Sequence, residues 1–413
     1  MQFQRQSLTP LNHKEFRWFL FCRFFYTMAL RMVATVVAYQ LFHLTRSSFS
    51  IGIVGLSEFI PVFSLALYAG HIIDRSDKRT LLLRGILSYS VCIAALVFVT
   101  SAWVQSRLST ANTALCFYVI IFFSGVIRAF AGPTSNAIIA QLVPKDVLRF
   151  AASLSSTSWL TASILGHASA GFLIAGIGAH YTFTVIFFLA FTASLALSRI
   201  EKKPVVVTNL TTKTWDSVKE GIRFVFSHKV LLGAISLDLF AVLFGGAVAL
   251  IPEFADRVLH VGPVGFGWLN AAMDIGSVIM IFSLTLSPIS RRQGYKLFYA
   301  VGGFGLCIII FGLSRLYWLS FAALMIAGML DGISVVIRST VLQLTTPDEM
   351  RGRVSSVNSM FINSSNELGQ FESGFTAKLL GGAVPAVLFG GTMTLVVVII
   401  NWLKAPALRK FEY

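Results

Sequence analysis

Apolar runs long enough to cross a lipid bilayer recur along the whole chain, and they constrain its fold more than any other feature. A membrane-spanning helix needs about 20 apolar residues. With only 12% charged residues among its 413, the chain also lies far from the roughly 25% that is typical of soluble domains. We therefore expect an all-α membrane protein that crosses a lipid bilayer many times. We identify twelve spans, near residues 17–44, 50–73, 80–101, 113–143, 151–177, 179–199, 230–251, 262–288, 296–314, 317–345, 353–380 and 383–403.

The basic residues indicate how the spans are oriented. With the amino terminus inside, 24 of the 33 lysines and arginines fall in inside segments and only 4 in outside segments. Cytoplasmic loops of membrane proteins carry such an excess of Lys and Arg. We therefore expect both termini in the cytoplasm, and we attribute the net charge of +15 to this topology and not to nucleic acid binding. The 4 cysteines lie within spans without C-x-x-C spacing, so no metal site is expected.

Two inside loops resemble each other. The loop after the fourth span reads Gln141-Leu142-Val143-Pro144-Lys145-Asp146, and the loop after the tenth reads Gln343-Leu344-Thr345-Thr346-Pro347-Asp348. Duplicated six-span halves suit a carrier that rocks around a site at their interface. A chance match of one short loop is the alternative. The duplication predicts one bundle over residues 1–199 and a second over residues 230–413.

A polar segment, residues 200–229, joins the two predicted bundles. Its apolar residues fall on one helical face, which predicts an amphipathic helix along the inner membrane surface that acts as a tether. These residues are Trp215, Val218, Ile222, Val225 and Phe226.

Several charged residues lie inside the apolar runs, where an arginine at the bilayer centre costs about 2.5 to 3.5 kcal/mol. Counted at 1.5 Å of rise per residue from the nearest cytoplasmic charge, six of them lie about 20 to 26 Å deep, near mid-bilayer. These six are Arg31, Glu58, Arg128, Asp274, Arg338 and Glu367. Intramembrane charges of both signs usually mark the path of a solute or an ion. Structural ion pairs are the alternative.

Two parts of this charged band have readings of their own. Arg31 and Glu58 lie on neighbouring spans at matching depth, so they are also placed to pair with each other. Glu367 lies in a polar run that contains Asn363 and Asn366, which predicts that this span lines a cavity and contacts solute or protons.

Other charged or titratable residues are harder to assign. Asp238 is a candidate for the same site or a structural acid of the inner leaflet, and His167 is either a proton site or a packed structural histidine. Arg23 is shallow enough for its side chain to snorkel to the interface. Asp331 and Glu372 are expected near the outer face.

Three motifs resemble those of a known family. Gly70-His71-Ile72-Ile73-Asp74-Arg75-Ser76-Asp77-Lys78-Arg79 resembles the major facilitator superfamily signature G-x-x-x-D-R-x-G-R-[RK], with Asp77 and Lys78 as departures. Arg128-Ala129-Phe130-Ala131-Gly132 resembles the R-x-x-x-G core of a motif of its proton antiporters. Gly166-His167-Ala168-Ser169-Ala170-Gly171 resembles the exporters' G-P-x-x-G-G, with His167 and Ala170 as departures.

The resemblance covers the whole chain and implies the major facilitator fold, with twelve transmembrane helices in two pseudo-symmetric six-helix bundles. Within the superfamily, Arg23-Phe24 and the loop from Thr346 to Arg353 are similar to bacterial enterobactin-type siderophore exporters. The resemblance therefore implies a protein of the bacterial inner membrane.

The first motif predicts a gate. An acid at Asp74 is placed to face the amino terminus of span eleven, where unpaired N–H groups favour a negative charge by about 0.3 to 1 kcal/mol. The gate is expected to comprise Gly70, Asp74, Arg75, Lys78 and Arg79, with Asp146 and Asp348 as partners of the basic residues in the inside-closed state. An ordinary positive-inside loop is the alternative, although it explains the basic residues alone.

Common enzyme motifs are absent from the sequence, which has no G-x-x-x-x-G-K-[ST], G-x-S-x-G or H-E-x-x-H. We expect no enzyme activity and no cofactor, with an ion gradient as the energy source. A buried carboxylate near an arginine can exchange a proton, which predicts proton coupling. Together with the resemblance, which implies export, we expect a proton-coupled exporter of an amphipathic small molecule, siderophore or drug-like, and we expect a monomer. The alternatives are an importer of a small solute or metal chelate, and a non-transporting receptor or scaffold.

Overall fold

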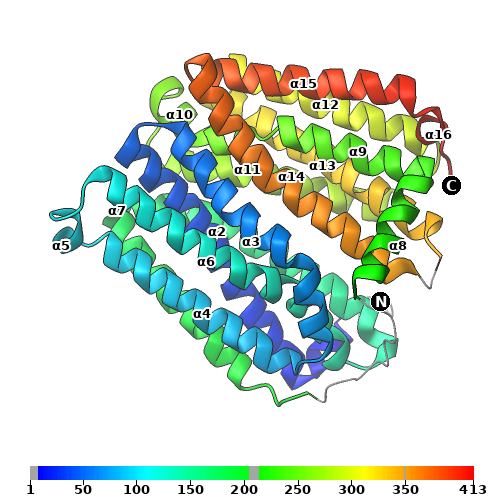
Figure 1. Cartoon of the computed structure of the whole chain (residues 1–413), viewed down its shortest axis with the longest axis horizontal. Helices are drawn as coiled ribbons and strands as arrows, with labels where there is room; N and C mark the ends of the chain where they lie inside the picture. Colours follow the sequence, from blue (N-terminus) through cyan, green and yellow to red (C-terminus); the bar gives the residue numbers. More distant parts are fainter. Residues whose placement is uncertain (1–7, 204–213, 348–349) are drawn as a thin grey trace. The chain divides into compact units, whose positions relative to one another are not determined.

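The computed structural model describes residues 8–203, 214–347 and 350–413 (Figure 1). These residues form helices and no strand. Their contacts divide the chain into two compact units. The first unit comprises Met1–Gln40 and Ile60–Asn209, and the second comprises Leu41–Phe59 and Leu210–Tyr413. The predicted domain boundaries at residues 199 and 230 stay a prediction.

Five long helices form the amino-terminal half of the chain, and α2 and α3 each contribute residues to both units. They are α2 (Lys14–Thr45), α3 (Ser48–Asp74), α4 (Lys78–Val99), α6 (Thr110–Ala137) and α7 (Leu148–Ser198). Within the first unit α4 packs against both α6 and α7. Gly178 leaves helical geometry inside α7, with φ 80° and ψ 167°. This left-handed φ is readily adopted only by glycine, and it divides α7 between the two predicted spans 151–177 and 179–199.

The second unit contains the remaining long helices. They are α8 (Thr214–Ser227), α9 (Lys229–Phe244), α11 (Pro263–Leu286), α12 (Gln293–Leu313), α13 (Tyr317–Thr345), α14 (Arg351–Leu380) and α15 (Ala383–Lys404). Helix α12 packs between α13 and α15, α11 packs on α13, and α9 packs on α14 and α15 (Figure 1).

Short helical segments join or end the long helices. They are η1 (Thr9–Asn12), α5 (Ala102–Gln105), η2 (Ile138–Gln141), η3 (Lys145–Val147), η4 (Ala247–Leu250), α10 (Ile251–Glu253), η5 (Phe254–Val258) and α16 (Pro406–Arg409).

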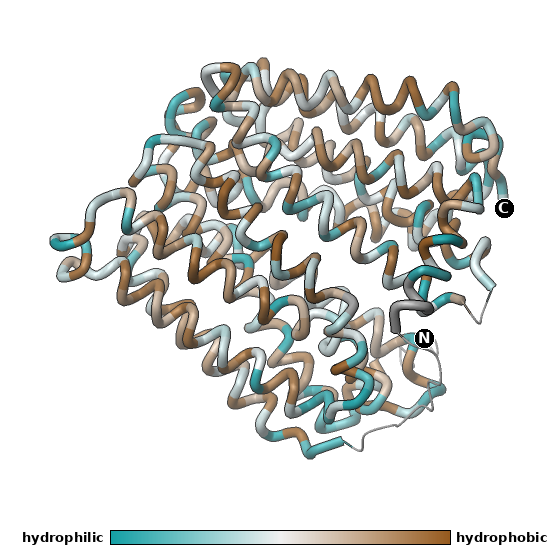
Figure 2. The backbone as a smooth tube through the Cα atoms, in the orientation of Figure 1, coloured by the Kyte–Doolittle hydropathy of each residue, from teal (hydrophilic) through white to brown (hydrophobic). Residues whose placement is uncertain are grey.

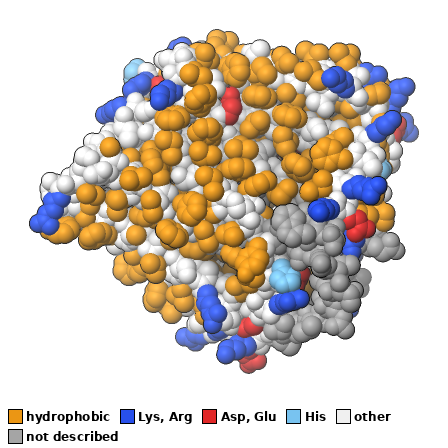
Figure 3. All heavy atoms as spheres, viewed as in Figure 1, with side chains coloured by type: hydrophobic (Ala, Val, Ile, Leu, Met, Phe, Trp, Pro, Cys, Tyr) orange, Lys and Arg blue, Asp and Glu red, His pale blue; other side chains and the backbone are white. Residues whose placement is uncertain are grey.

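Among the described residues, 10 helices are long and apolar enough to cross a membrane. The break at Gly178 makes two spans of one of them, and the 30-residue α14 is too polar to be counted although it is long enough. Together these give the twelve predicted spans. Apolar residues follow the helices in Figure 2, and hydrophobic side chains cover much of the face drawn in Figure 3. Large apolar side chains are exposed, including Trp318 at 76% and Leu403 at 71%, as expected for a protein surrounded by lipid.

The seventh predicted span, residues 230–251, is not one continuous helix. Helix α9 ends at Phe244, and the Gly245–Gly246 pair separates it from the 3-10 helix η4. A Cβ atom on Gly245 would lie 2.5 Å from the Phe304 ring, and one on Gly246 would lie 2.8 Å from the carbonyl oxygen of Gly369. The break therefore needs two residues without side chains, and it lies within the predicted span.

The predicted amphipathic helix of the linker is present as α8. Val225 is fully buried in a cluster with residues of α9, α13 and α14, and Ile222 packs against it. Phe226, which was predicted on the same face, is 60% exposed. The side chains of Trp215 and Val218 lie outside the described part of the chain.

Candidate functional site

An ion pair between α9 and α13 forms the centre of the candidate site in the second unit. Arg338 Nη1 contacts Asp238 Oδ2, and the two side chains are only 12% and 7% exposed. Arg338 Nε also donates to Ser334 Oγ, one turn earlier on α13, at 3.1 Å. The pair accounts for two of the residues that the sequence singled out, and it joins them directly although they come from different spans.

Two further acids extend from this pair. Asp331 precedes Arg338 by two turns of α13 and interacts electrostatically with it, with Asp238 and with Asp274 of α11. Asp238 and Asp331 therefore both act on one guanidinium, and Asp274 acts on Asp331. Asp331 was predicted near the outer face, which is wrong, because it lies fourteen residues from either end of α13. The seven-residue spacing of Asp331 and Arg338 was a signal in the sequence, since it places them on one helical face.

The acids can approach each other because α11 and α13 cross very closely. A Cβ on Gly276 of α11 would lie 1.9 Å from the carbonyl oxygen of Met325, and one on Gly328 of α13 would lie 2.0 Å from that of Met273. The Ser277 hydroxyl donates to the Gly328 carbonyl at 3.0 Å. The crossing therefore lies directly beside Asp274 in sequence and one turn before Asp331.

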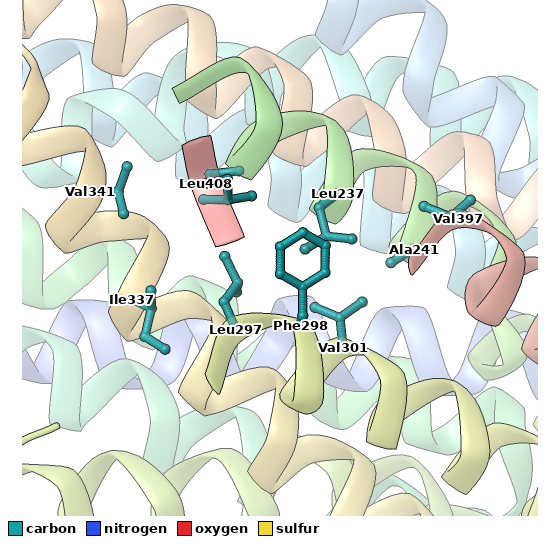
Figure 4. Close-up of a cluster of buried hydrophobic side chains, with 10 residues drawn as sticks. Leu237, Ala241, Leu297, Phe298, Val301, Ile337, Val341, Val397 and Leu408 are labelled. Atoms are coloured by element: carbon teal, nitrogen blue, oxygen red, sulfur yellow. The ribbon is translucent and has the colours of Figure 1, made fainter. Parts of the chain in front are cut away.

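The apolar core of the second unit positions the pair (Figure 4). Leu237 and Ile337, the residues preceding Asp238 and Arg338, are fully buried in this core. They pack with Leu297, Phe298 and other residues of α12, α13, α15 and α16. Because these apolar neighbours hold the backbone beside Asp238 and Arg338, packing fixes the points from which the two charged side chains extend.

In the first unit, Arg31 meets an aromatic ring. Its guanidinium carbon lies 5.0 Å from the centroid of the Trp159 ring of α7. One turn later on α2, Thr35 Oγ1 donates to the Arg31 carbonyl at 3.0 Å and lies 2.7 Å from Nδ1 of the buried His167. A hydroxyl has one proton, so with that proton on the Arg31 carbonyl, His167 donates from Nδ1. Arg31 belongs to the first unit and its predicted partner Glu58 to the second.

Two more arginines lie in the spans of the first unit. Arg23, which was expected to snorkel, donates from Nη1 to Ser135 Oγ at 2.9 Å and to Asn136 Oδ1 at 3.1 Å. It is therefore bound at the end of α6. Arg128 acts electrostatically on Tyr26, whose buried hydroxyl has no hydrogen-bond partner in the described part of the chain.

The polar run on α14 presents its residues in different directions. Glu367 is 7% exposed, whereas Asn363 and Asn366 are exposed. The Asn366 side chain donates back to the Ile362 carbonyl at 3.0 Å. Gly55 of α3 packs against the Glu367 backbone, since a Cβ there would lie 2.7 Å from the Glu367 carbonyl oxygen.

Near the end of α14, the Glu372 carboxylate accepts a hydrogen bond from the Thr376 hydroxyl at 2.8 Å. This position is two turns before Leu380, the last residue of the helix.

Arg79 of the predicted gate contacts the carboxyl end of α7. Its guanidinium donates to the carbonyls of Ser198 at 2.8 Å and Ile200 at 2.9 Å, and its pairing with Asp146 or Asp348 in the inside-closed state stays a prediction. The last carbonyls of a helix lack partners within it, so a cation is favourable there. Asp348 lies outside the described residues.

The other gate residues lie around the end of α3. Asp74 and Arg75 are exposed, Lys78 is half-buried, and nothing lies within 4 Å of a Cβ built on Gly70. The gating role of this segment stays a prediction.

Asp77, a departure from the family motif, caps α4. Its carboxylate accepts hydrogen bonds from the Arg79 amide at 3.2 Å, from the Thr80 hydroxyl, and from the Lys203 amide at 3.1 Å. Burial raises the pKa of Asp77, but these hydrogen bonds outweigh it, so the pKa lies below its ordinary value. Glu15 also pairs with Lys203. The start of the linker is thereby attached to the first unit.

A charged network that sequence reasoning missed joins the α2–α3 corner to the segment after α9. Arg46 pairs with Asp256 at 3.1 Å, and Arg257 pairs with the buried Glu253 at 3.1 Å. Arg257 also donates to the Arg46 carbonyl at 3.0 Å, and Ser48 donates to Glu253. The sequence showed these residues only as sparse charges of outside loops, because their pairing needs segments about 200 positions apart.

Helices of spanning length that carry charged residues are typical of a multi-pass membrane protein. A family model of the Major Facilitator Superfamily matches residues 19–370. The chain therefore belongs to the major facilitator superfamily, as its motifs predicted.

Similar proteins agree with this family. The enterobactin exporter EntS of Shigella flexneri is 22% identical over 412 residues, which cover 97% of this chain and 94% of that protein. The uncharacterized transporter YfmI of Bacillus subtilis (strain 168) is 25% identical over 360 residues, covering 82% and 86%. A D-xylose-proton symporter has the same fold, with a TM-score of 0.73 at 13% identity over 98% of this chain and 100% of that one.

Proposed function

We propose that the chain is a proton-coupled exporter that moves an amphipathic small molecule by alternating access. The observation that carries this proposal is the buried Arg338–Asp238 pair, with Asp331 acting on both of its members and Asp274 acting on Asp331. Buried charges inside membrane spans are conspicuous in transporters because they are unfavourable unless they bind a solute or an ion. A structural pair needs one acid for one arginine, and here Asp331 is a second acid that acts on Arg338.

The cluster offers a simple proton cycle. With Asp238 ionised, its carboxylate compensates the Arg338 guanidinium. When Asp238 takes up a proton, it loses its negative charge and the pair weakens, so Arg338 becomes available to another anion. Release of the proton to the cytoplasm restores the pair.

Similarity supports the proposed cargo and direction of transport. EntS is named an enterobactin exporter, and we propose a siderophore or a drug-like amphipathic molecule as the cargo of this chain. We also propose that it lies in a bacterial inner membrane with both termini in the cytoplasm, since 24 basic residues fall in inside segments. Comparison of metabolites released by cells with and without the gene, in iron-poor and iron-rich medium, would identify the cargo.

Proton coupling can be tested in everted membrane vesicles. Respiration acidifies the vesicle interior, acridine orange reports the pH difference, and an extract of medium from iron-starved cells supplies the cargo. A proton antiporter takes up cargo and releases protons, so the dye fluorescence should recover with wild-type protein. Asp238→Asn should abolish this recovery.

Glu372→Gln is the matched control, because Glu372 bonds to a neutral hydroxyl near the end of α14. It should retain the recovery. Full recovery with Asp238→Asn would refute the role of Asp238, and the absence of recovery with wild-type vesicles that do transport the cargo would refute proton coupling.

A further inference from the structure

Arg31 lies in a span of the first unit, where its guanidinium contacts an aromatic ring. It lies near the middle of the 32-residue α2, and its guanidinium stacks on Trp159 at 5.0 Å. No ion pair involves Arg31 within the ranges that the structure describes. An indole on the face of a guanidinium leaves its N–H donors at the edge, where they form a planar fork.

The position of Arg31 is fixed by the contact between α2 and α7. A Cβ on Gly166 of α7 would lie 2.8 Å from Arg31 Cβ and 2.9 Å from the Met28 carbonyl oxygen, so only glycine allows this approach. One turn further along α2, the contact of Thr35 with His167 joins the same two helices. The base of the Arg31 side chain is therefore held on both sides.

The charges of the first unit favour an anion at this point. Arg23, Arg31 and Arg128 lie inside its spans. Its described carboxylates instead lie at helix ends or in loops, namely Glu15, Asp74, Asp77, Asp146 and Glu201. A negatively charged group that enters near Arg31 therefore meets attraction without a competing acid from this unit.

We infer that Arg31 and Trp159 form a subsite for a carboxylate attached to an aromatic or similarly apolar body. The guanidinium fork matches the two oxygens of a carboxylate, which it can bind through two parallel hydrogen bonds. Trp159 holds the fork and offers an apolar surface to the rest of the molecule. This inference rests on the proposed transport function, since it names the class of solute that is carried.

Equilibrium binding of dansylglycine and its neutral amide, dansylglycinamide, to the purified protein tests the subsite. The two probes differ only in the carboxylate. Arg31→Gln should weaken dansylglycine binding by about tenfold or more and change dansylglycinamide binding by less than about twofold. Arg31→Lys, which retains the charge without the planar fork, should give an intermediate loss for the carboxylate and provides the test if Arg31→Gln does not fold.

The chain supplies a matched control in Arg107, which stacks on Trp103 at 3.9 Å outside the long helices. Arg107→Gln should leave both affinities unchanged. Energy transfer from tryptophan to the bound dansyl group locates the probe, and Trp159→Phe should lower it more than Trp103→Phe.

Three results would overturn the subsite: no saturable dansylglycine binding to the wild-type protein, equal losses for both probes in the Arg31 variants, or no loss in either. The measurement uses no proton gradient. Failure of proton coupling therefore leaves it unchanged.

Discussion

The arginines described above have different kinds of partner in the two units. In the first unit, Arg23 binds a hydroxyl and an amide, Arg31 stacks on an indole, and Arg79 binds backbone carbonyls. In the second unit, Arg338 and Arg257 pair with buried carboxylates. Neutral partners orient a guanidinium but leave its charge uncompensated. A carboxylate compensates the charge, and it loses this effect when it takes up a proton. The first arrangement suits binding of an anionic solute, and the second suits coupling to protons.

Removal of the Arg338 guanidinium should have the largest effect on stability. Arg338→Gln leaves the buried Asp238 without its cation and near the further acid Asp331, and loss of one partner of a buried ion pair costs about 3 to 5 kcal/mol. The double variant Asp238→Asn/Arg338→Gln should recover much of this loss. Thermal unfolding in detergent measures both effects.

Arg23→Gln makes the same chemical change in the first unit and sharpens the comparison. Its partners Ser135 and Asn136 are neutral, so we expect a smaller loss of about 1 to 2 kcal/mol. Equal losses of stability for Arg23→Gln and Arg338→Gln would show that neutral and carboxylate partners do not differ in how much the arginine contributes.

The close crossing of α11 and α13 predicts the next largest effect. The methyl group of Gly276→Ala would lie 1.9 Å from the Met325 carbonyl oxygen, so the helices must move apart, at a cost of about 1 to 3 kcal/mol. That movement also separates Asp274 from Asp331, and proton-driven transport should fall with stability. Gly132→Ala of α6 is the control, because nothing lies within 4 Å of its added Cβ; unchanged melting of both variants would argue against the crossing.

Much of the fold could be predicted because spans are written in consecutive residues. Apolar runs located the long helices, and even the division of α7 fell between two predicted spans, at Gly178. The interruption of α9 at Gly245–Gly246 was missed because its cause is not local. It depends on the Phe304 ring and the Gly369 backbone, which approach only in the folded chain.

The candidate site was predictable in composition but not in pairing. Counting along helices selected Asp238, Asp274 and Arg338, because charges in apolar runs stand out. It did not show that Asp238 contacts Arg338, since a residue count gives depth and not rotation around a helix axis. Asp331 was misplaced although its spacing from Arg338 was readable. The Arg31–Trp159 stack was invisible for another reason, because an indole in a span looks like any other apolar residue.

The smallest expected effect concerns Asp77. Its carboxylate accepts hydrogen bonds from two backbone amides and one hydroxyl, and none of these donor groups is charged. Loss of a helix cap costs about 1 kcal/mol, so Asp77→Ala should lower stability by about that amount at neutral pH. Because folding lowers the pKa of Asp77, its contribution is complete above the unfolded value of about 3.9 and disappears as the pH falls through the lower folded value. The melting temperatures of wild type and Asp77→Ala should therefore differ at pH 7 and converge only in strong acid.

Asp146→Ala is the control for this prediction. It removes an exposed acid from the first turn of η3, where no side chain caps the helix, and it should have no such effect. A difference between the melting temperatures of wild type and Asp77→Ala that grows toward acid pH would contradict the capping role.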